Sequence, residues 1–174
     1  MREDAVVTDE HNSTPLVDEA MKKASVAWVA VADGPALALW CVPLEGALCV
    51  VSGPGEQAAP GLVEADEAQV TLRGDHGGRI VTWRARVSRV RPGTDEWDTL
   101  APLVGAKRLN APGSTADLVA RWAADDCALV RLRPAGDVVH GGQLPADSLA
   151  EPPRPTSAVR AARKPFRLHR VRRR

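Results

Sequence analysis

The feature that most constrains the fold is a series of short apolar segments joined by turn-forming residues. Residues 25–32, 35–42 and 47–52 are rich in Val, Ala, Leu and Trp, and Asp33-Gly34 and the 43–46 stretch separate them. Connections this short make neighbouring strands pair antiparallel. Because the segments are almost continuously apolar, we expect the strands to be buried on both faces or to line a closed barrel.

Two further strands are predicted downstream. Residues 68–73 form the first, and a Gly-rich turn at 74–78 leads into the longest strand, at 79–91. In the long strand apolar residues alternate with polar ones, which is typical of a strand with one polar face; the apolar set is Val81, Trp83, Ala85 and Val87. The alternation slips at Arg89-Val90, which indicates a bulge or the end of the strand.

Helix signals lie on either side of this strand region. Thr14-Pro15 reads as an N-cap and first helical residue of a helix that ends near Lys22-Lys23, and Thr94 caps a second helix. Ser114 or Thr115 caps a third, and residues 127–133 form a last strand that Pro134 closes. We also expect a short helix that contains Leu62 and Val63. The predicted fold is mostly β with flanking helices, an antiparallel barrel of about six strands.

Charge divides the chain into an acidic body and a basic tail. Residues 151–174 hold eight Arg and one Lys against a single acid, a net charge of +8, so a total of +1 leaves −7 on residues 1–150. We predict a flexible N-terminus at 1–13, one domain at 14–142 and a disordered Pro/Arg-rich tail at 143–174. A tail of this kind binds nucleic acid nonspecifically, although a solubilising extension is an equal alternative.

Composition excludes several classes of protein. No apolar run approaches the ~20 residues of a membrane-spanning helix, and residues 1–10 lack a signal core, so we expect a cytoplasmic protein with no membrane contact. The three cysteines, Cys41, Cys49 and Cys127, have no metal-ligand spacing and are expected to be buried thiols. His76 fits a turn residue better than a general base, and we assign no metal site and no catalytic residue.

The order of these segments resembles that in the pyridoxamine 5′-phosphate oxidase-like split-barrel superfamily, and the local sequence is similar to that of its actinobacterial members. The matching pieces are VAWVAVADGPALALWCV at 26–42, GALCVVSGPGEQAAPGL at 46–62, AQVTLRG at 68–74 and GRIVTWRARVSRV at 78–90. The resemblance implies a six-stranded split barrel that binds FMN or a deazaflavin (coenzyme F-420) at the interface of a homodimer. It also implies an oxidoreductase that acts on a small molecule of unknown identity.

The resemblance places the cofactor around the loop that follows residue 52 and on the adjacent strands. The implied cofactor-binding residues are Val51, Ser52, Gly53, Gly55, Gln57, Gly61, Leu62, Arg73, Arg79, Trp83 and Arg84. Relatives carry Lys or Arg in this loop, whereas here the loop has Glu56 and Gln57. An anion would then be held by backbone N–H groups of Gly53 and Gly55 and by the start of the expected helix near Pro60-Gly61.

Two departures from the pattern of this superfamily support a second hypothesis. The loop at 53–61 contains no base, and Trp83 stands where many relatives have glycine, so its indole either stacks on a ring system or fills the space of a cofactor. The alternative is therefore a non-catalytic binding or regulatory module that kept the barrel, lost the cofactor and contacts nucleic acid through its tail. A basic stripe on the long strand favours phosphate or carboxylate recognition, or else a solvated or dimer-facing surface; it consists of Arg84, Arg86, Arg89 and Arg91.

Overall fold

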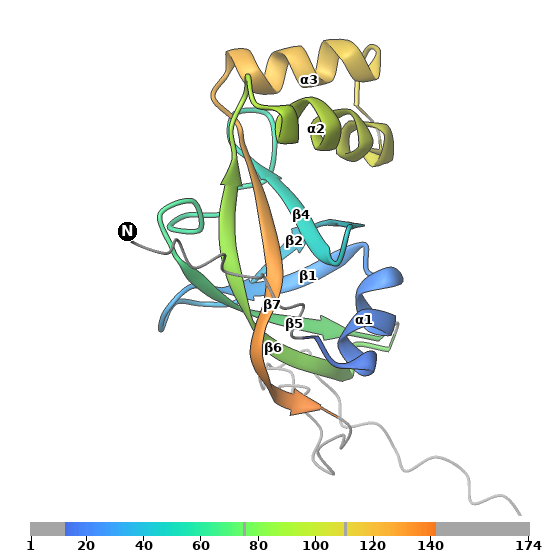
Figure 1. Cartoon of the computed structure of the whole chain (residues 1–174), viewed down its shortest axis with the longest axis vertical. Coiled ribbons are helices and arrows are strands. Elements are labelled where there is room, and N and C mark those ends of the chain that lie inside the picture. Colours follow the sequence, from blue (N-terminus) through green and yellow to red (C-terminus); the bar gives the residue numbers. More distant parts are fainter. Residues whose placement is uncertain (1–12, 75, 110, 142–174) are drawn as a thin grey trace, which may run out of the picture. The chain divides into compact units, whose positions relative to one another are not determined.

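The computed structural model describes residues 13–74, 76–109 and 111–141, and these residues form an antiparallel β structure with three helices (Figure 1). The predicted N-terminal segment, apart from Ser13, and the predicted tail at 143–174 lie outside the described residues. The elements are α1 Pro15–Lys22, β1 Val26–Ala30, β2 Leu37–Trp40, β3 Val42–Leu44, β4 Ala47–Ser52, β5 Glu67–Arg73, β6 Arg79–Val90, α2 Asp95–Lys107, α3 Thr115–Ala124 and β7 Ala128–Gly141.

The strands make one seven-stranded sheet in the order β2-β1-β5-β6-β7-β4-β3, with antiparallel pairing throughout. The sheet curls into a nearly closed barrel whose seam separates β2 from β4, so the predicted split-barrel architecture is confirmed. The described residues form seven strands rather than six, because Val42–Leu44, most of which was expected to be a connection, pairs with β4. The turn between them uses Glu45 and Gly46, with φ of 46° and 70°, as a two-residue hairpin turn requires.

The last strand does not stop at Pro134, and that prediction was wrong. β7 continues to Gly141, and its pairing with β6 jumps from Ala85↔Pro134 to Trp83↔Val138. The extra residues of β7 form a bulge. Proline lacks an N–H and is tolerated at a bulge because no ladder hydrogen bond is required there. At the other end β6 stops at Val90, so the slip in alternation at Arg89-Val90 marked a strand end.

The short helix expected after the 53–61 loop is absent; residues 60–64 form turns instead. Gly61 has a φ of 75°, a left-handed conformation that interrupts helical backbone, and the Leu62 N–H donates to the carbonyl of Ala59 at 3.2 Å. Leu62 is nevertheless buried, at 1% exposure. The positive end of a helix is therefore not present near Pro60-Gly61.

Two hydrophobic cores lie on opposite faces of the sheet, and β4 belongs to both. Leu48 and Val50 pack inside the barrel, whereas Cys49 and Val51 face a second core formed with α2 and α3. All six residues of β4 are buried. This confirms the expectation that its continuous apolar run is covered on both faces.

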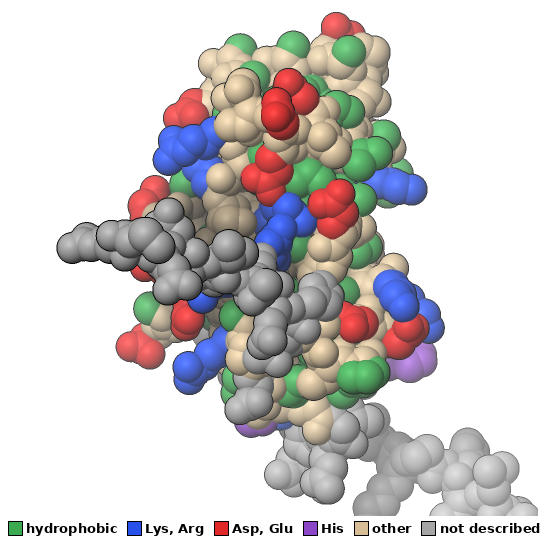
Figure 2. Space-filling view, viewed as in Figure 1, with side chains coloured by type: hydrophobic (Ala, Val, Ile, Leu, Met, Phe, Trp, Pro, Cys, Tyr) green, Lys and Arg blue, Asp and Glu red, His purple; other side chains and the backbone are tan. Residues whose placement is uncertain are grey.

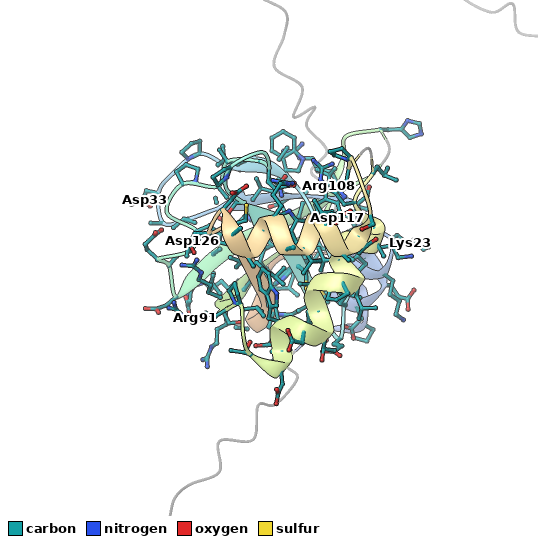
Figure 3. All side chains as sticks on the ribbon, turned by 90° about the horizontal axis from the view of Figure 1, so that it is seen from above. Lys23, Asp33, Arg91, Arg108, Asp117 and Asp126 are labelled. Atoms are coloured by element: carbon teal, nitrogen blue, oxygen red, sulfur yellow. The ribbon has the colours of Figure 1, made fainter. Side chains whose placement is uncertain are left out.

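The helices begin where the sequence predicted. Thr14 and Thr94 accept hydrogen bonds from the N–H groups three residues ahead, and Ser114, rather than Thr115, caps α3. Figure 3 shows α2 and α3 side by side over one end of the β structure, and α1 packs against β6. In the described part of the chain, no helix is long and apolar enough to cross a membrane.

Arg131 ties the second core to its surroundings. Its side chain on β7 is 4% exposed, and its Nη1 donates to Glu96 of α2 at 2.6 Å while Nη2 donates to Glu45 at 3.3 Å. Its buried Nε has no acceptor. The two carboxylates are 47% and 61% exposed, so this is a buried cation held by anions at the surface.

Candidate functional site

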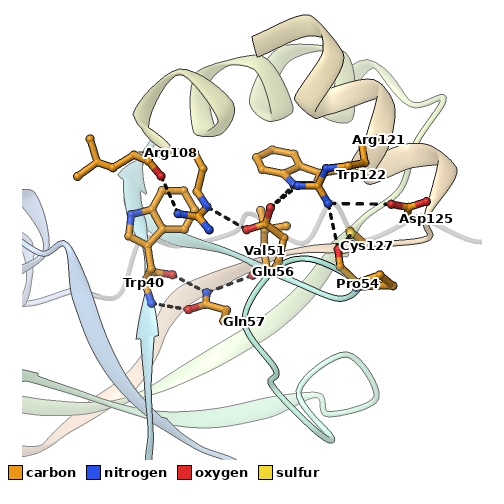
Figure 4. Close-up of polar contacts among 11 residues, drawn as sticks. Trp40, Val51, Pro54, Glu56, Gln57, Arg108, Arg121, Trp122, Asp125 and Cys127 are labelled. Atoms are coloured by element: carbon orange, nitrogen blue, oxygen red, sulfur yellow. Dashed lines mark hydrogen bonds and ion pairs between the residues drawn. The ribbon is translucent and has the colours of Figure 1, made fainter. Parts of the chain in front are cut away.

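The loop at 53–57 is organised around one buried carboxylate (Figure 4). The Glu56 side chain is 3% exposed and accepts hydrogen bonds from Arg121 Nη2 at 2.6 Å, Arg108 Nε at 2.9 Å and Trp122 Nε1 at 3.0 Å. Arg121 also donates to the carbonyl of Pro54 at 3.0 Å. This glutamate therefore joins the loop to the C-cap of α2 and to α3.

The charge balance of this cluster leaves little room for a ligand anion. Burial acts to raise the pKa of Glu56, but the hydrogen bonds from Trp122, Arg121 and Arg108 outweigh it and hold the pKa below its ordinary value of 4.5. The carboxylate is thus ionised at neutral pH and, together with Asp125 at 4.0 Å from Arg121 Nη1, balances the charge of the two guanidinium groups that face the loop. A phosphate at the same place would meet a negative charge already bound there.

Gln57 closes the seam of the barrel. Its side-chain amide accepts from the Trp40 N–H at 2.7 Å and donates to the Trp40 carbonyl at 2.8 Å, as a neighbouring strand would, and it also donates to the Val51 carbonyl at 3.1 Å (Figure 4). The Gly53 N–H donates to the Gln57 carbonyl at 3.3 Å. The Gly53 N–H and the Gln57 side-chain amide, both expected to hold a cofactor, are therefore bonded within the protein.

The other predicted loop residues are close-packed. Val51 and Ser52 are buried at the end of β4, at 0% and 7% exposure. A Cβ on Gly53 would meet the Cα of Cys127 at 2.9 Å, and one on Gly55 would meet the Arg121 guanidinium at 2.8 Å. These glycines let the loop approach α3 and Cys127, the residue before β7, so packing by itself explains why they are glycines.

The predicted residues on the strands lie elsewhere, on two faces. Trp83 points into the barrel core at 1% exposure, and its Nε1 has no hydrogen-bond acceptor. Arg84 is exposed on the outer face of β6, and Arg73 pairs with Arg79 at the irregularity in the β5–β6 hairpin. The structure thus separates the eleven implied residues into the closed loop region, the barrel interior and the outer strand surface.

The outer face of β1, β5 and β6 is the strongest candidate site. Pairing sets Trp28 beside Thr71 and Thr82 in one row, and Ala30 beside Gln69 and Arg84 in the next. The alternating residues Ala68, Val70 and Leu72 point into the core, so the polar side chains of β5 point outward. We name this surface, with Arg73 and Arg79 at its hairpin end, the Trp28 face.

An aromatic ring and a cation meet on the Trp28 face. The guanidinium carbon of Arg73 lies 4.9 Å from the centroid of the half-buried Trp28 ring, and Arg73 Nη1 donates to the Gly77 carbonyl at 3.0 Å. The hydroxyl groups of Thr71 and Thr82 are 2.8 Å apart in the same row. A flat ring and cations therefore share one sheet surface, whereas Thr82 is 1% exposed and its hydroxyl is paired with that of Thr71.

An open hollow adjoins these residues. Its volume is about 760 Å³, within the range of ligand sites, and Gln69 and Arg84 are among its lining residues. The β1–β2 turn, the segment before β5 and the first residue of β5 supply four carboxylates to the lining: Asp33, Glu64, Asp66 and Glu67. The Trp28 face therefore has acidic groups at one end and Arg73 with Arg79 at the other.

Sequence reasoning found the arginines of this face but missed its ring and hydroxyl groups. The alternation of polar and apolar residues within 67–73 could have revealed the hydroxyl group of Thr71, because it places Gln69 and Thr71 on the same side of the strand as Arg73. Trp28 lay inside a run with no visible alternation, so only strand pairing shows which way it points. Of the predicted basic stripe, Arg84 and Arg86 are exposed on β6, while Arg89 donates to Asp126 at 2.7 Å.

All three cysteines are buried and free. Burial raises the pKa of Cys41 to about 12 and that of Cys49 to about 11. His76 is exposed in the β5–β6 turn, and no metal-binding cluster of His, Cys, Asp or Glu is found among the described residues. Figure 2 shows acidic and basic side chains interspersed over one face of the protein.

Comparison with solved structures supports the fold. HutZ, the heme storage protein from Vibrio cholerae, aligns with a TM-score of 0.51 at 16% identity, over 71% of this chain and 91% of that one. An FAD-binding protein from Mesorhizobium loti aligns with a TM-score of 0.47 at 15% identity, over 68% and 85%. At such identities the likeness to HutZ concerns the split-barrel fold alone. No family model matches the sequence, and no curated protein does.

Proposed function

We propose that this protein binds a flavin-type cofactor, FMN or the deazaflavin coenzyme F-420, on the Trp28 face and acts as an oxidoreductase on a small molecule. One observation carries the proposal: the Trp28 ring, held by Arg73 at 4.9 Å, lies on the same rigid surface as the hollow lined by Gln69 and Arg84. The fold likeness to HutZ is consistent with this, since that protein stores heme, another large planar ring.

The residues of the Trp28 face suit such a ligand. An indole stacks on a flat ring, and the Gln69 amide offers both a donor and an acceptor to the polar edge of a flavin. Arg73 and Arg79 match a phosphate with planar guanidinium groups. Residues 69 and 73 are about 13 Å apart along a strand, so a ring near Gln69 and a phosphate near the hairpin fit one molecule.

The loop at 53–57 does not fit the phosphate. Its Glu56 carboxylate already accepts from Arg108 and Arg121, and its Gln57 amide bonds to the backbone of Trp40. We therefore assign the anionic end of the ligand to Arg73 and Arg79, away from the carboxylates of the hollow. Hydride transfer would be the cofactor's chemistry, and the protein's part would be to bind and orient the ring.

Titration of the purified protein with FMN and with coenzyme F-420 tests the proposal. We expect saturable binding, seen as a change in ligand fluorescence, that weakens at least about tenfold in Arg73→Gln, since a charged hydrogen bond contributes ~1.5–3 kcal/mol. Arg91→Gln is the matched control, because Arg91 is exposed outside the Trp28 face. Absence of binding by either cofactor, or equal losses in both variants, would contradict the proposal.

A homodimer is part of the same proposal. Val26 and Ile80 are large apolar residues exposed on the outer side of β1 and β6, at 47% and 41%. A second copy that packs on the Trp28 face would cover them and enclose the ring. Sedimentation of the wild type and of a Val26→Asp variant tests this: we expect a dimer that the added charge dissociates, and a monomeric wild type would contradict it.

The second candidate is a binding module without a cofactor, and the Glu56 cluster favours it because the protein's own carboxylates, Glu56 and Asp125, pair with the cations beside the loop. In this reading the basic tail contacts nucleic acid. Deleting residues 151–174 is expected to abolish DNA binding and its steep salt dependence. Unchanged DNA affinity after the deletion would remove that role.

A further inference from the structure

An apolar pocket lies on the inner side of the sheet, between the β1–β2 hairpin and the loop before β5. The buried side chains of Val29, Leu39 and Leu62 form its floor, and exposed residues that include Pro35 and Pro60 form its rim. All of its lining residues are Val, Leu, Ala, Pro or Gly. The pocket therefore leads from the surface of the protein to its core, and a ligand can enter it from solvent.

This pocket is separate from the Trp28 face. Val29 of β1 belongs to the barrel core, whereas Trp28, the residue before it, lies in the outward row beside Thr71. Successive residues of a strand point to opposite faces, so a molecule in the pocket contacts the inner side of the sheet and not the outward side chain of Gln69. The pocket is thus independent of the proposed flavin site.

Both walls of the pocket are held apart by hydrogen bonds. On one side Val29 and Leu37 are partners in the β1–β2 ladder. The opposite wall, residues 59–62, follows shortly after Gln57, whose side-chain amide bonds to the backbone of Trp40 at 2.7 and 2.8 Å. Protein interiors are ordinarily close-packed, so a space between two fixed walls is one that side chains of the protein do not fill.

The backbone groups recorded at the pocket are paired within the protein. The Gly34 N–H donates to the Val31 carbonyl at 3.0 Å, and the Leu62 N–H donates to the Ala59 carbonyl at 3.2 Å. Cavities lined by apolar groups stay dry and accept apolar molecules. A hydroxyl group or a charge inside the pocket would have no partner, which costs affinity. The fitting occupant is therefore a hydrocarbon group.

Volume and charge narrow the choice further. The pocket has a volume of about 100 Å³, which at ~30 Å³ for a group of the size of a water molecule gives room for about three or four carbons. A benzene ring occupies a cavity of ~150 Å³, so an aromatic ring is too large. Asp33 adjoins the lining residue Gly34, and Glu64 follows Leu62 by two residues; both carboxylates are exposed and disfavour an anion at the mouth.

We propose that this pocket binds a short aliphatic chain, about three or four carbons long, of a small molecule that carries no negative charge. The chain fills the space above Val29, Leu39 and Leu62, and the polar group of the ligand stays at the mouth, in water. Each methylene that enters the pocket strengthens binding about fourfold, and carbons beyond the mouth add little. A series of chain lengths therefore shows a break where the pocket is full.

Titration of the full chain with straight-chain alcohols from 1-propanol to 1-hexanol tests the proposal, with the methyl resonances of Leu39 and Leu62 followed by NMR. We expect saturable shifts and an affinity that rises about fourfold from 1-propanol to 1-butanol. From 1-butanol to 1-hexanol we expect a total gain below about twofold, because the added carbons stay outside. Butyrate should bind at least about tenfold more weakly than 1-butanol, because its charge would lie at an apolar mouth.

Two variants change the size of the pocket in opposite directions. Ala59→Leu fills it and should weaken 1-butanol at least about tenfold. Ala58→Leu is the matched control, because Ala58 is exposed in the same loop and does not line the pocket, and it should leave the affinity unchanged. Leu37→Ala removes three carbons from a half-buried wall, so the gain of about fourfold per carbon should continue through 1-hexanol.

The series separates a defined pocket from general partitioning onto the protein. Shifts that do not saturate, a wild-type affinity that keeps rising fourfold per carbon to 1-hexanol, or equal losses in Ala59→Leu and Ala58→Leu would overturn the proposal. Butyrate binding as tight as that of 1-butanol would overturn the exclusion of a negative charge. Should Ala59→Leu not fold, Leu37→Ala decides, since a break that stays at four carbons contradicts the assigned site. These results hold whether or not a flavin binds the Trp28 face.

Discussion

Replacing Glu56 tests whether the loop at 53–57 is held in place by a single buried carboxylate. Glu56→Ala removes the acceptor of three hydrogen bonds at once and leaves two guanidinium groups and one indole N–H without it. Glu56→Gln keeps an oxygen for the Trp122 N–H but removes the charge. The two variants therefore separate the hydrogen bond from the ion pairs.

The expected loss follows from the exposure of each donor. Trp122 is fully buried, so its unpaired N–H costs about 1–3 kcal/mol. Arg108 and Arg121 are 31% and 34% exposed, and water replaces part of what they lose, so each contributes about 0.5–1 kcal/mol. We expect Glu56→Ala to lower the free energy of unfolding by about 3 kcal/mol. For Glu56→Gln we expect a loss of about 1–2 kcal/mol.

Urea unfolding followed by tryptophan fluorescence measures both losses. With a slope of ~2 kcal/mol per molar urea, the Glu56→Ala midpoint falls by about 1.5 M. Since the native pKa of Glu56 lies below 4.5, its stabilisation is complete above that value and is lost as the pH falls through the lowered pKa. Wild type and Glu56→Gln should thus converge in acid. A Glu56→Ala loss as small as that of the exposed Glu64→Ala control would refute the reasoning.

Three further predictions concern stability. Gln57→Ala should lower the free energy of unfolding by about 1–3 kcal/mol and speed amide exchange at the barrel seam, measured by hydrogen exchange. Unchanged exchange would contradict the role of Gln57 in closing the seam. Arg131→Met should leave the free energy of unfolding within about 1 kcal/mol of wild type, because it removes a buried charge whose Nε is unpaired. Glu96→Ala should lower it more, because it removes a carboxylate that pairs with that buried charge. A larger loss for Arg131→Met than for Glu96→Ala would contradict this. Because burial raises the pKa of Cys41 and Cys49 from 9.0 to about 12 and 11, the unfolded chain loses their protons first, and stability should fall as the pH rises above 9.0; a rise in that range would argue against buried thiols.

The barrel was predictable from the sequence because its signals are local. The apolar run at 47–52 is long enough to show burial on both faces, and the β1–β2 turn at Asp33-Gly34 shows which strands pair. The extension of β7 past Pro134 was not predictable, because a bulge depends on the register with β6 rather than on the proline itself. The same holds for β3, which exists only because β4 lies beside it.

The candidate site was harder to predict because its parts come from separate strands. Arg73 and Arg84 are visible as charges in the sequence, but their relation to Trp28 depends on the pairing of β1 with β5 and of β5 with β6. Glu56 looked like a mismatch to a phosphate loop. Its actual partners, Arg108 and Arg121, are 52 and 65 residues away, a distance over which no local pattern operates.

The double burial of β4 has a consequence for how this protein unfolds. Two separate cores would ordinarily allow one layer to melt while the other persists. Here Leu48 and Val50 anchor one core and Cys49 and Val51 the other, on consecutive residues of one strand. Neither layer can lose its packing without displacing that strand from the other layer. The barrel and the helices on its end should therefore unfold in a single cooperative step, with coincident transitions by every probe.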